Sequence, residues 1–587
     1  MKNFFTSFLG TLAGLFVFNI LIALIFVCII GGIVAVASKD KTTKVEPNSV
    51  LRLDFSMPIT ERTIKNPFED LDFSGTGKKE IGLNDIKANI EHAKEDENIK
   101  GIYIDMMSVP AGMATVEEIR NSLVDFKESG KFIIAYSEIY TQKAYYLASV
   151  ADKIYVNPQG IIEWKGLGAQ IMFFKNMMEK LEVEPQIFRH GKFKSAVEPF
   201  MLDKMSDANR EQTMTYVRSI WDHMVEGVAK ERKISVEELN KMADDLTVQK
   251  AEDAVKYKLA DGVKYKDEIL DELKDKLGLE SKEKVHYVNI TDYSDDKKIS
   301  KEKQKIAVVY AVGQIEGGNG DDDETMGSDR ISKAIRQARQ DSNVKAIVLR
   351  VNSPGGSALA SDVIWREMVL AKKAKTVIVS MGDVAASGGY YIACAADKIV
   401  CQPNTITGSI GVFGMFPVME KLFKNKFGIT VDTVNTNNHS DFGNPFRQVK
   451  KEEGDIIQHS VENIYDDFIA KVAEGRKKEK ASIDSIGQGR VWSGVDALKI
   501  GLVDTLGGIE DAIAMAARMA KLDKYKIQEL PALKDPLESL FKNAKDDAET
   551  KLLKENLGDT YELFIHFKQL MNMKGVQMRL PYEVILN

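Results

Sequence analysis

The segment NVKAIVLRV at residues 343–351 consists mainly of β-branched and aliphatic residues, as in a strand buried on both faces of a parallel sheet. A second segment of the same pattern, NIKGIYIDM at residues 98–106, lies 245 positions earlier in the chain. A shared pattern at a fixed separation is the signature of an internal repeat. The two segments therefore predict that the chain contains two copies of one structural unit.

Neighbouring segments keep the same separation. AYYLASVADKIYVNP begins at Ala144 and GYYIACAADKIVCQP begins at Gly389, again 245 positions apart. The apolar positions of an amphipathic helix before the first strand also correspond: Ile86, Ile90 and Ala93 match Ile331, Ile335 and Ala338. Strands that alternate with helices form parallel βαβ units with both faces of the sheet covered. The sequence therefore predicts an α/β fold built as two tandem domains.

The chain is too long, at 587 residues, for one ordinary core. A polar, lysine-rich stretch, SDDKKISKEKQK, separates the two copies and is typical of a linker. The repeat ends near residue 523, after which the sequence is charged and helix-like. We therefore expect five regions: an N-terminal membrane anchor (1–45), the first copy (46–293), the linker (294–305), the second copy (306–523) and a C-terminal helical tail (524–587).

Residues 3–38 carry no charge over 36 positions, whereas a membrane-spanning helix needs about 20 apolar residues. This favours one uncleaved transmembrane helix. The alternative is a cleaved signal peptide, because AVA at residues 35–37 resembles a cleavage site. The apolar region of such a peptide is normally only about 7–15 residues long, and the run here is much longer.

The charges around this segment predict its orientation. Lys2 precedes it, whereas Lys39, Lys41 and Lys44 follow it and are partly offset by Asp40. Because positive charges accumulate on the cytoplasmic side, the flanking lysines alone would place the body of the protein in the cytoplasm.

The composition excludes several classes of protein. The 80 basic and 87 acidic residues give a net charge of −7, which argues against a nucleic-acid-binding surface. Cys28, Cys394 and Cys401 lack the spacing of a zinc or redox motif, so we interpret them as packed thiols. The sequence shows no cluster of metal ligands and no GxxxxGK[ST] phosphate loop. We therefore expect no cofactor, metal or nucleotide.

Two glycine-bearing turns occur in the second copy and are missing from the first. VNSPGG (351–356) follows one predicted strand, and MGDVAASGGYY (381–391) places Ser387 between the next strand and an apolar helix. Serine is a common helix N-cap, which is the simplest explanation for Ser387. However, a cap does not require neighbouring glycines, and glycine turns at a helix N-terminus can form an oxyanion hole. The first copy has Gln142 in the place of Ser387.

A serine hydroxyl needs a base to become a nucleophile. None of the seven histidines lies in a recognisable triad motif and no GxSxG motif is present, although spacing alone does not exclude a Ser-His-Asp triad. HGKFKSAVEPF (190–200) in the first copy offers Lys194, whose counterpart in the second copy is Ser440. Lys194 could act as a base if burial lowered its pKa from about 10.4 to about 7. Otherwise it is an ordinary solvated surface lysine.

Five motifs occur here in the order found in the long, two-copy form of bacterial signal peptide peptidase (protease IV). They are FKSAVEPF (193–200), VNSPGG (351–356), ASGGYY (386–391), TGSIGVFG (407–414) and GRVWSGVDALKIGLVD (489–504). The chain resembles that family over nearly its whole length. The resemblance implies a serine protease with a Ser-Lys dyad, in which Ser387 is the nucleophile and Lys194 the general base. It also implies that Ser409 hydrogen-bonds the lysine and that the oxyanion hole is formed at Gly355, Gly356 and Gly388.

The same resemblance implies a βα superhelix of the crotonase and Clp-protease type, assembled as a homotetramer. It further implies a single-pass protein of the inner (cytoplasmic) membrane with periplasmic catalytic domains, opposite to the location that the flanking charges predict. The implied substrates are hydrophobic peptides left in the membrane after signal-peptide cleavage. Two other functions remain open at this point: a crotonase-type acyl-CoA enzyme, and a catalytically silent membrane scaffold.

Overall fold

The computed structural model describes residues 45–63, 81–293, 302–320, 325–533 and 576–580, together with parts of 7–25. Most of the expected anchor, linker and C-terminal tail therefore lies outside the described residues. Within the part of the chain that is described, no helix has the length and apolar character needed to span a bilayer.

The first copy is built on a six-stranded parallel sheet with the order β8-β6-β5-β4-β1-β9. Its strands are β1 (Ser49–Leu53), β4 (Ile99–Asp105), β5 (Phe132–Tyr140), β6 (Lys153–Ile162), β8 (Gly262–Val263) and β9 (Tyr287–Asn289). Its first helices are α2 (Leu83–Glu95), α3 (Met113–Lys127) and α4 (Gln142–Ala148). Two short strands, β2 (Ile59–Thr60) and β3 (Ile81–Gly82), pair beside it.

The second copy is built on an eight-stranded sheet with the main order β19-β17-β15-β13-β10-β21, which is parallel except that β19 is antiparallel to β17. The strands are β10 (Lys305–Val312), β13 (Val344–Ser353), β15 (Thr376–Ala386), β17 (Ile406–Gly408), β19 (Val491–Ser493) and β21 (Lys526–Leu530), with β16 (Lys398–Cys401) and β20 (Thr505–Leu506) alongside. The helices α11 (Ser328–Gln340) and α12 (Ala358–Ala374) begin 245 residues after α2 and α3. The separation seen in the sequence is therefore a repeat of secondary structure as well.

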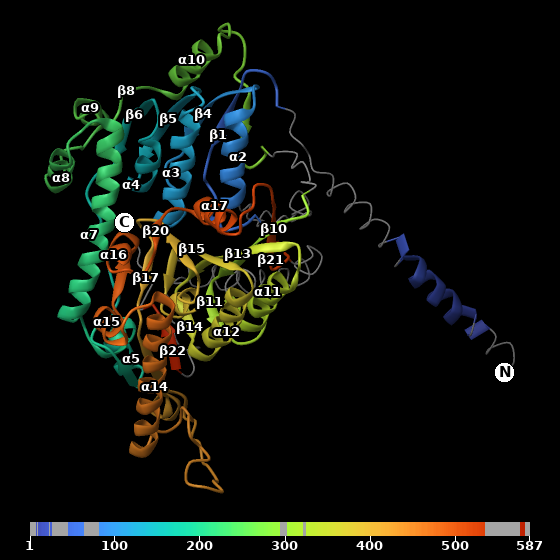
Figure 1. Cartoon of the computed structure of the whole chain (residues 1–587), viewed down its shortest axis with the longest axis vertical. Coiled ribbons are helices and arrows are strands. Elements are labelled where there is room, and N and C mark those ends of the chain that lie inside the picture. Colours follow the sequence, from blue (N-terminus) through green and yellow to red (C-terminus); the bar gives the residue numbers. More distant parts are fainter. Residues whose placement is uncertain are drawn as a thin grey trace.

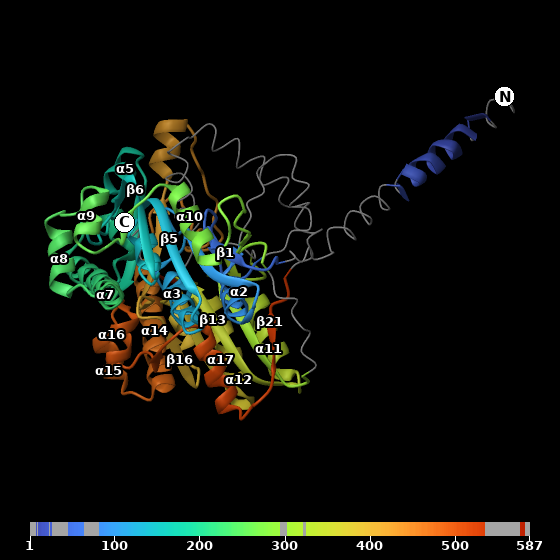
Figure 2. The same ribbon diagram turned by 90° about the horizontal axis from the view of Figure 1, so that it is seen from above.

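Further helices complete each copy. The first copy continues with α5 (Lys175–Lys180), a short 3₁₀ turn η2 (Ser195–Val197), α6 (Glu198–Met201), α7 (Asp207–Arg232), α8 (Val236–Asp244), α9 (Ala251–Lys256) and α10 (Lys266–Leu277). The second copy continues with α13 (Gly388–Ala393), the π-helical turn η3 (Leu422–Phe427), α14 (Lys451–Arg476), α15 (Lys480–Ile486), α16 (Gly494–Lys499) and α17 (Ile509–Met519). Figure 1 shows the strands of the first copy, in blue to cyan, above those of the second, in yellow to orange. Figure 2 shows α8 and α9 at the periphery of the molecule.

A third sheet joins the two copies, and this sheet positions the site. Its order is β12-β11-β14-β22-β18-β7. The new strands are β7 (Glu184–His190), β11 (Gln314–Glu316), β12 (Thr325–Gly327), β14 (Gly355–Ser357), β18 (Val412–Val418) and β22 (Val576–Arg579). β7 belongs to the first copy and pairs antiparallel with β18 of the second, from Glu184 opposite Val418 to His190 opposite Val412.

The expected helical tail is wrong wherever the structure describes it. Residues 526–530 form β21 at the edge of the second sheet, and residues 576–579 form β22 inside the third sheet. Both segments are too short to carry a local helix or strand signal. Their conformation is instead set by neighbouring strands, which supply hydrogen-bond partners that the sequence pattern does not reveal.

Buried charges also tie the copies together. Arg350 on β13 contacts Glu118 on α3 at 2.7 Å, and neither side chain is exposed to solvent. Arg350 also contacts Glu61 at 2.9 Å, and Glu118 contacts Lys87 at 2.8 Å. These opposite charges hold the pKa of the Glu118 carboxyl down, at about 2. The interface between copies is therefore fixed by a paired ionic network as well as by apolar packing.

Candidate active site

Ser387 lies at the sharp turn from β15 into α13. Its φ of 55° is in the left-handed region, which is unusual for a residue with a side chain. The turn is held because the backbone N–H of Ser387 donates to the carbonyl of Gly408 on the paired strand β17, at 2.8 Å. Its side chain makes no capping hydrogen bond to α13. The hydroxyl is therefore not used as a helix cap, which was the simplest interpretation of this serine.

Lys194 comes from the first copy, just beyond the end of β7. Because β7 pairs with β18, the following residues run along a loop of the second copy, where Phe193 N–H donates to the Gln488 carbonyl at 2.9 Å. Gly489 permits this approach, since a Cβ at that position would lie 2.6 Å from the Cα of Lys194. From α7, the Gln212 side chain donates to the Phe193 carbonyl at 3.0 Å. The backbone of Lys194 is thus held from two sides.

The structure brings the predicted residues together. The Nζ atom of Lys194 lies 2.9 Å from the Oγ of Ser387 and 3.1 Å from the Oγ of Ser409. All three residues are fully buried. Burial alone lowers the pKa of Lys194 well below its ordinary value, and among the described residues no acidic group offsets this effect. The interpretation of Lys194 as a solvated surface lysine is therefore wrong.

Ser409 follows β17 and also has a left-handed backbone, with a φ of 48°. Its N–H donates to the carbonyl of Arg490 at 2.7 Å, which fixes the turn. The side chain of Lys194 passes Gly411, where a Cβ would lie 3.1 Å from its Cδ. Gly411 and Gly489 both lie in motifs noted in the sequence. Their role of making room for the lysine was missed, because it depends on a contact between the copies.

Two of the three glycines expected at the oxyanion hole, Gly355 and Gly388, lie beside Ser387. Gly355 has a φ of 96°, and a Cβ there would come within 2.7 Å of the Gly388 nitrogen. Gly356 follows directly on β14, and a Cβ on Gly388 would lie 2.7 Å from the Ser361 Oγ. These positions therefore admit only glycine without displacement of their neighbours. Backbone amides crowded at a helix N-terminus are suited to stabilise a developing negative charge.

Three of the histidines in the described part of the chain are engaged with other groups. His190 stacks on Tyr465 with ring centroids 4.0 Å apart, His223 contacts Glu117 and His439 contacts Glu453. Among the described residues, the basic side chain within hydrogen-bond distance of Ser387 is Lys194. The geometry therefore gives no support to a Ser-His-Asp triad.

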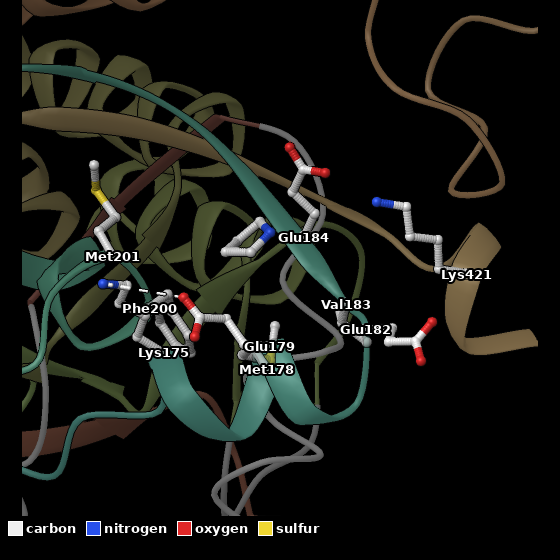
Figure 3. Close-up of a pocket in the computed structure, with 10 residues that line it drawn as sticks. Lys175, Met178, Glu179, Glu182, Val183, Glu184, Phe200, Met201 and Lys421 are labelled. Atoms are coloured by element: carbon white, nitrogen blue, oxygen red, sulfur yellow. Dashed lines mark ion pairs between the residues drawn. The ribbon is translucent and has the colours of Figure 1, made fainter. Parts of the chain in front are cut away.

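A separate pocket of about 470 Å³ lies where α5, the start of β7 and α6 meet (Figure 3). Its wall is partly apolar, with Met178 and Phe200, and partly charged, with Lys175 and Glu179. Neither Ser387 nor Lys194 lines it. Within the described ranges, no group of three or more His, Cys, Asp or Glu side chains could hold a metal ion.

Comparison with known proteins relates this geometry to a family. The family model described as "Peptidase family S49" matches residues 125–280 and 370–523, one segment in each copy. The model described as "Clp protease" matches residues 319–407, which supports a Clp-protease-like α/β fold.

Comparison with individual proteins agrees with the matches to these family models. Protease 4 of Haemophilus influenzae is 37% identical over 454 residues, covering 75% of this chain and 73% of that protein. Protease 4 of Salmonella typhi is 38% identical over 459 residues, covering 76% and 74%. The chloroplastic serine protease SPPA of Arabidopsis thaliana is 34% identical over 469 residues, covering 78% and 69%. The similarity therefore extends through both copies.

Proposed function

From the premise that this chain belongs to peptidase family S49 and is a serine protease, we propose that Ser387 is its nucleophile and Lys194 its general base. One observation carries the proposal: the buried Lys194 Nζ lies 2.9 Å from the Ser387 Oγ. Burial lowers the pKa of this lysine, so an uncharged amine is available to accept the hydroxyl proton. A serine activated in this way can attack a peptide carbonyl.

The reaction is an acyl transfer in two stages. Lys194 takes the proton of Ser387 as the oxygen attacks the carbonyl, and backbone N–H groups at Gly355, Gly356 and Gly388 stabilise the oxyanion. Lys194 then gives the proton to the leaving amine, which leaves an acyl-enzyme. Water, deprotonated by the same lysine, releases the acyl group. Ser409, at 3.1 Å from Nζ, orients the amine during both proton transfers.

Membership of a peptidase family leaves the two other functions considered from the sequence without support. An acyl-CoA enzyme has no use for a buried lysine against a serine hydroxyl, and a silent scaffold has no reason to hold Ser387 in a strained turn.

The proposed substrates are hydrophobic peptides that remain in the membrane after signal-peptide cleavage. The uncharged residues 3–38 support this assignment, because a protein tethered by them reaches such peptides by lateral diffusion. We place the catalytic domains on the periplasmic side of the inner membrane. Digestion of the chain by an added protease in spheroplasts, but not in intact cells, is the expected result. Protection in spheroplasts would instead support the orientation predicted by the flanking lysines.

The proposed assembly is a homotetramer. The segment from the end of η3 to the start of α14 extends beyond the rest of the molecule (Figure 1) and exposes several apolar side chains. These are Phe427, Ile429, Val431, Val434 and Phe442. Contiguous exposed apolar groups are typical of protein contacts, and a second copy of the chain would cover them. Light scattering on the purified protein is expected to give four times the monomer mass, and a monomer would contradict the assembly.

Covalent labelling tests the nucleophile. A fluorophosphonate probe is expected to label the wild-type chain and not Ser387→Ala, because the probe reacts with an activated serine hydroxyl. Ser361→Ala is a suitable control, since this buried serine lies next to Gly388 and its Oγ donates to the Ser357 carbonyl. Labelling that persists in Ser387→Ala would assign the nucleophile to another residue.

A further inference from the structure

Strand β15 is distorted just before it reaches Ser387. Its pairing with β13 is regular up to Met381 and resumes at Ala385, with a register shift between these residues. Residues 382–384 therefore form a bulge opposite Asn352. A bulge bends its strand and redirects the side chains that follow it. Because Ser387 lies three residues beyond the bulge, the bulge sets the direction in which its hydroxyl points.

Two residues of the bulge are held by side chains from outside β15. The Thr405 hydroxyl donates to the Gly382 carbonyl at 2.8 Å. The Asn352 side chain accepts from Val384 N–H at 3.1 Å and donates to Glu61, a residue of the first copy, at 2.9 Å. The bulge is therefore fixed by its own copy and, through Asn352, by the first copy as well.

The middle residue of the bulge, Asp383, binds the first copy directly. Its carboxylate accepts from Thr115 N–H at 2.9 Å and from the Thr115 hydroxyl at 2.6 Å. Thr115 is the third residue of α3, which lies against β15 (Figure 1) and begins after Gly112. Gly112 has no side chain that could cap the helix, and a Cβ there would lie 2.2 Å from the Asp383 Cγ. Asp383 therefore takes the place of an N-cap side chain for a helix of the other copy.

The equivalent helix of the second copy is capped from within. The N-cap of α12 is Ser357, which stands where α3 has Gly112 and accepts a hydrogen bond from the first turn of its own helix. Glu138, at the position equivalent to Asp383, is exposed to solvent. The repeated unit can therefore cap this helix by itself, whereas α3 takes its cap from the strand that leads to Ser387.

We propose that Asp383 is a positioning residue for Ser387: by capping α3 it fixes the β15 bulge to the first copy, so that Ser387 faces Lys194 only when the two copies are docked. This inference rests on the proposed function, because it takes Ser387 as the nucleophile. Ser387 and Lys194 belong to different copies, and a rigid link between the copies close to the turn maintains their 2.9 Å contact. Misplacement of a reacting group by about 1 Å can lower a rate by about 10²-fold.

Steady-state kinetics on the full chain test the proposal. Asp383→Ala is expected to lower kcat by about 10- to 100-fold and to leave KM for a reporter peptide within about twofold, because the lost contact positions Ser387 and does not bind the peptide. Asp383→Asn should recover most of this loss, since its side-chain oxygen can still accept from Thr115 N–H. Ser235→Ala is the matched control, because that serine caps the peripheral helix α8 in the same way (Figure 2). It should leave kcat unchanged.

A second substitution separates positioning from stability. Asp383→Ala should also lower the urea concentration at half-unfolding, because α3 loses its cap. Gly112→Ser in the same chain supplies a cap from within, as Ser357 does in α12, and the three atoms nearest to a Cβ on Gly112 belong to the carboxyl group that is removed. The double variant is expected to regain stability and to keep the low kcat of Asp383→Ala. Recovery of kcat together with stability would show a purely structural role and overturn the proposal.

The outcomes distinguish this inference from the proposed function. Wild-type kcat in Asp383→Ala, alongside an inactive Ser387→Ala, would overturn the positioning role and leave Ser387 as the nucleophile. A raised KM with unchanged kcat in Asp383→Ala would assign the residue to peptide binding and would also overturn the positioning role. Hydrolysis by Ser387→Ala would overturn both the inference and the proposed function.

Discussion

The same turn, from a central strand into a short helix, is built differently in the two copies. In the first copy the Thr141 hydroxyl caps the turn by accepting a hydrogen bond from Ala144 N–H. The Gln142 side chain accepts from the N–H groups of Lys165 and Gly166 and donates to the Gly166 carbonyl. In the second copy Ser387 makes no capping bond and has a φ of 55°. Polar groups that stabilise a turn are not free to react. The first copy thus uses the turn for stability, whereas the second holds the hydroxyl of the proposed nucleophile in a strained position.

The space beside this turn is filled by a side chain in the first copy and is left free of one in the second. In the first copy the Lys143 side chain crosses it and donates to the Ala111 carbonyl at 3.0 Å. The equivalent positions of the second copy are Gly388 and Gly356, which leave room for a peptide carbonyl. Conversely, the counterpart of Lys194 is Ser440, on an exposed segment. Each copy is incomplete alone, so one site arises from two copies of the unit.

Alanine at the two equivalent turn positions should give the largest contrast. Ser387→Ala is expected to lower kcat by about 10⁴-fold or more, because loss of a nucleophile leaves only binding and the oxyanion hole. Gln142→Ala should leave kcat unchanged and lower the free energy of unfolding by about 1–3 kcal/mol, because it leaves buried backbone groups unpaired. Peptide hydrolysis and chemical denaturation measure the two effects. Equal activities in the two variants would contradict a functional difference between the two turns.

The two lysines offer a second contrast. Lys194→Met is expected to lower kcat by about 10³-fold, within the range found for loss of a general base. Lys143→Met should retain activity, because that side chain bonds a backbone carbonyl of the first copy. Steady-state hydrolysis of a reporter peptide distinguishes them. An active Lys194→Met would transfer the role of base to another group.

Because the pKa of Lys194 is lowered, both the rate of hydrolysis and the stability of the protein should depend on pH. The rate should rise with pH through that pKa, well below 10.5, because only the neutral amine accepts a proton. The unfolded chain binds the proton more tightly, so stability should also rise with pH between the lowered pKa and the ordinary one. Lys194→Met should abolish this contribution to the rise of stability with pH. A rate independent of pH between about pH 6 and 9 would contradict the assignment.

The ionic network between the copies predicts a smaller effect, on stability. Glu118→Ala is expected to cost about 3–5 kcal/mol, because it leaves the buried Arg350 without one of its partners. The pKa of Glu118 is about 2, below its ordinary 4.5, so its contribution is present above pH 4.5 and is lost as the pH falls towards 2. The equivalent position in the second copy, Val363, is exposed, and Val363→Ala should cost less than about 0.5 kcal/mol. Equal costs would show that the network does not stabilise the interface.

The α/β fold followed from local patterns, and the Clp-protease-like match confirms it. The residues of the candidate site could be predicted because each lies in a short motif, the serines and glycines in glycine-bearing turns and Lys194 in FKSAVEPF, and the structure brings Lys194, Ser387 and Ser409 together. Their roles remain predictions. What the sequence did not reveal depends on pairing between distant strands. β7 meets β18 across the copies, and β22 fills a gap between two strands more than 150 residues earlier in the chain. Neither pairing has a local signal, because register is set by the partner strand.

Removal of the Ser409 hydroxyl should produce the smallest effect, and it tests whether this residue orients the lysine or only completes a turn. Ser409→Ala is expected to lower kcat by about fivefold, since one hydrogen bond contributes about 1 kcal/mol and a factor of ten corresponds to about 1.4 kcal/mol. Its counterpart in the first copy is Trp164, packed against Trp221 with ring centroids 5.0 Å apart, so nothing in that copy depends on a hydroxyl here. Ser409→Thr should restore much of the rate, because it keeps the hydroxyl. A purely structural role would instead lower stability in both variants and leave the pH dependence of kcat unchanged.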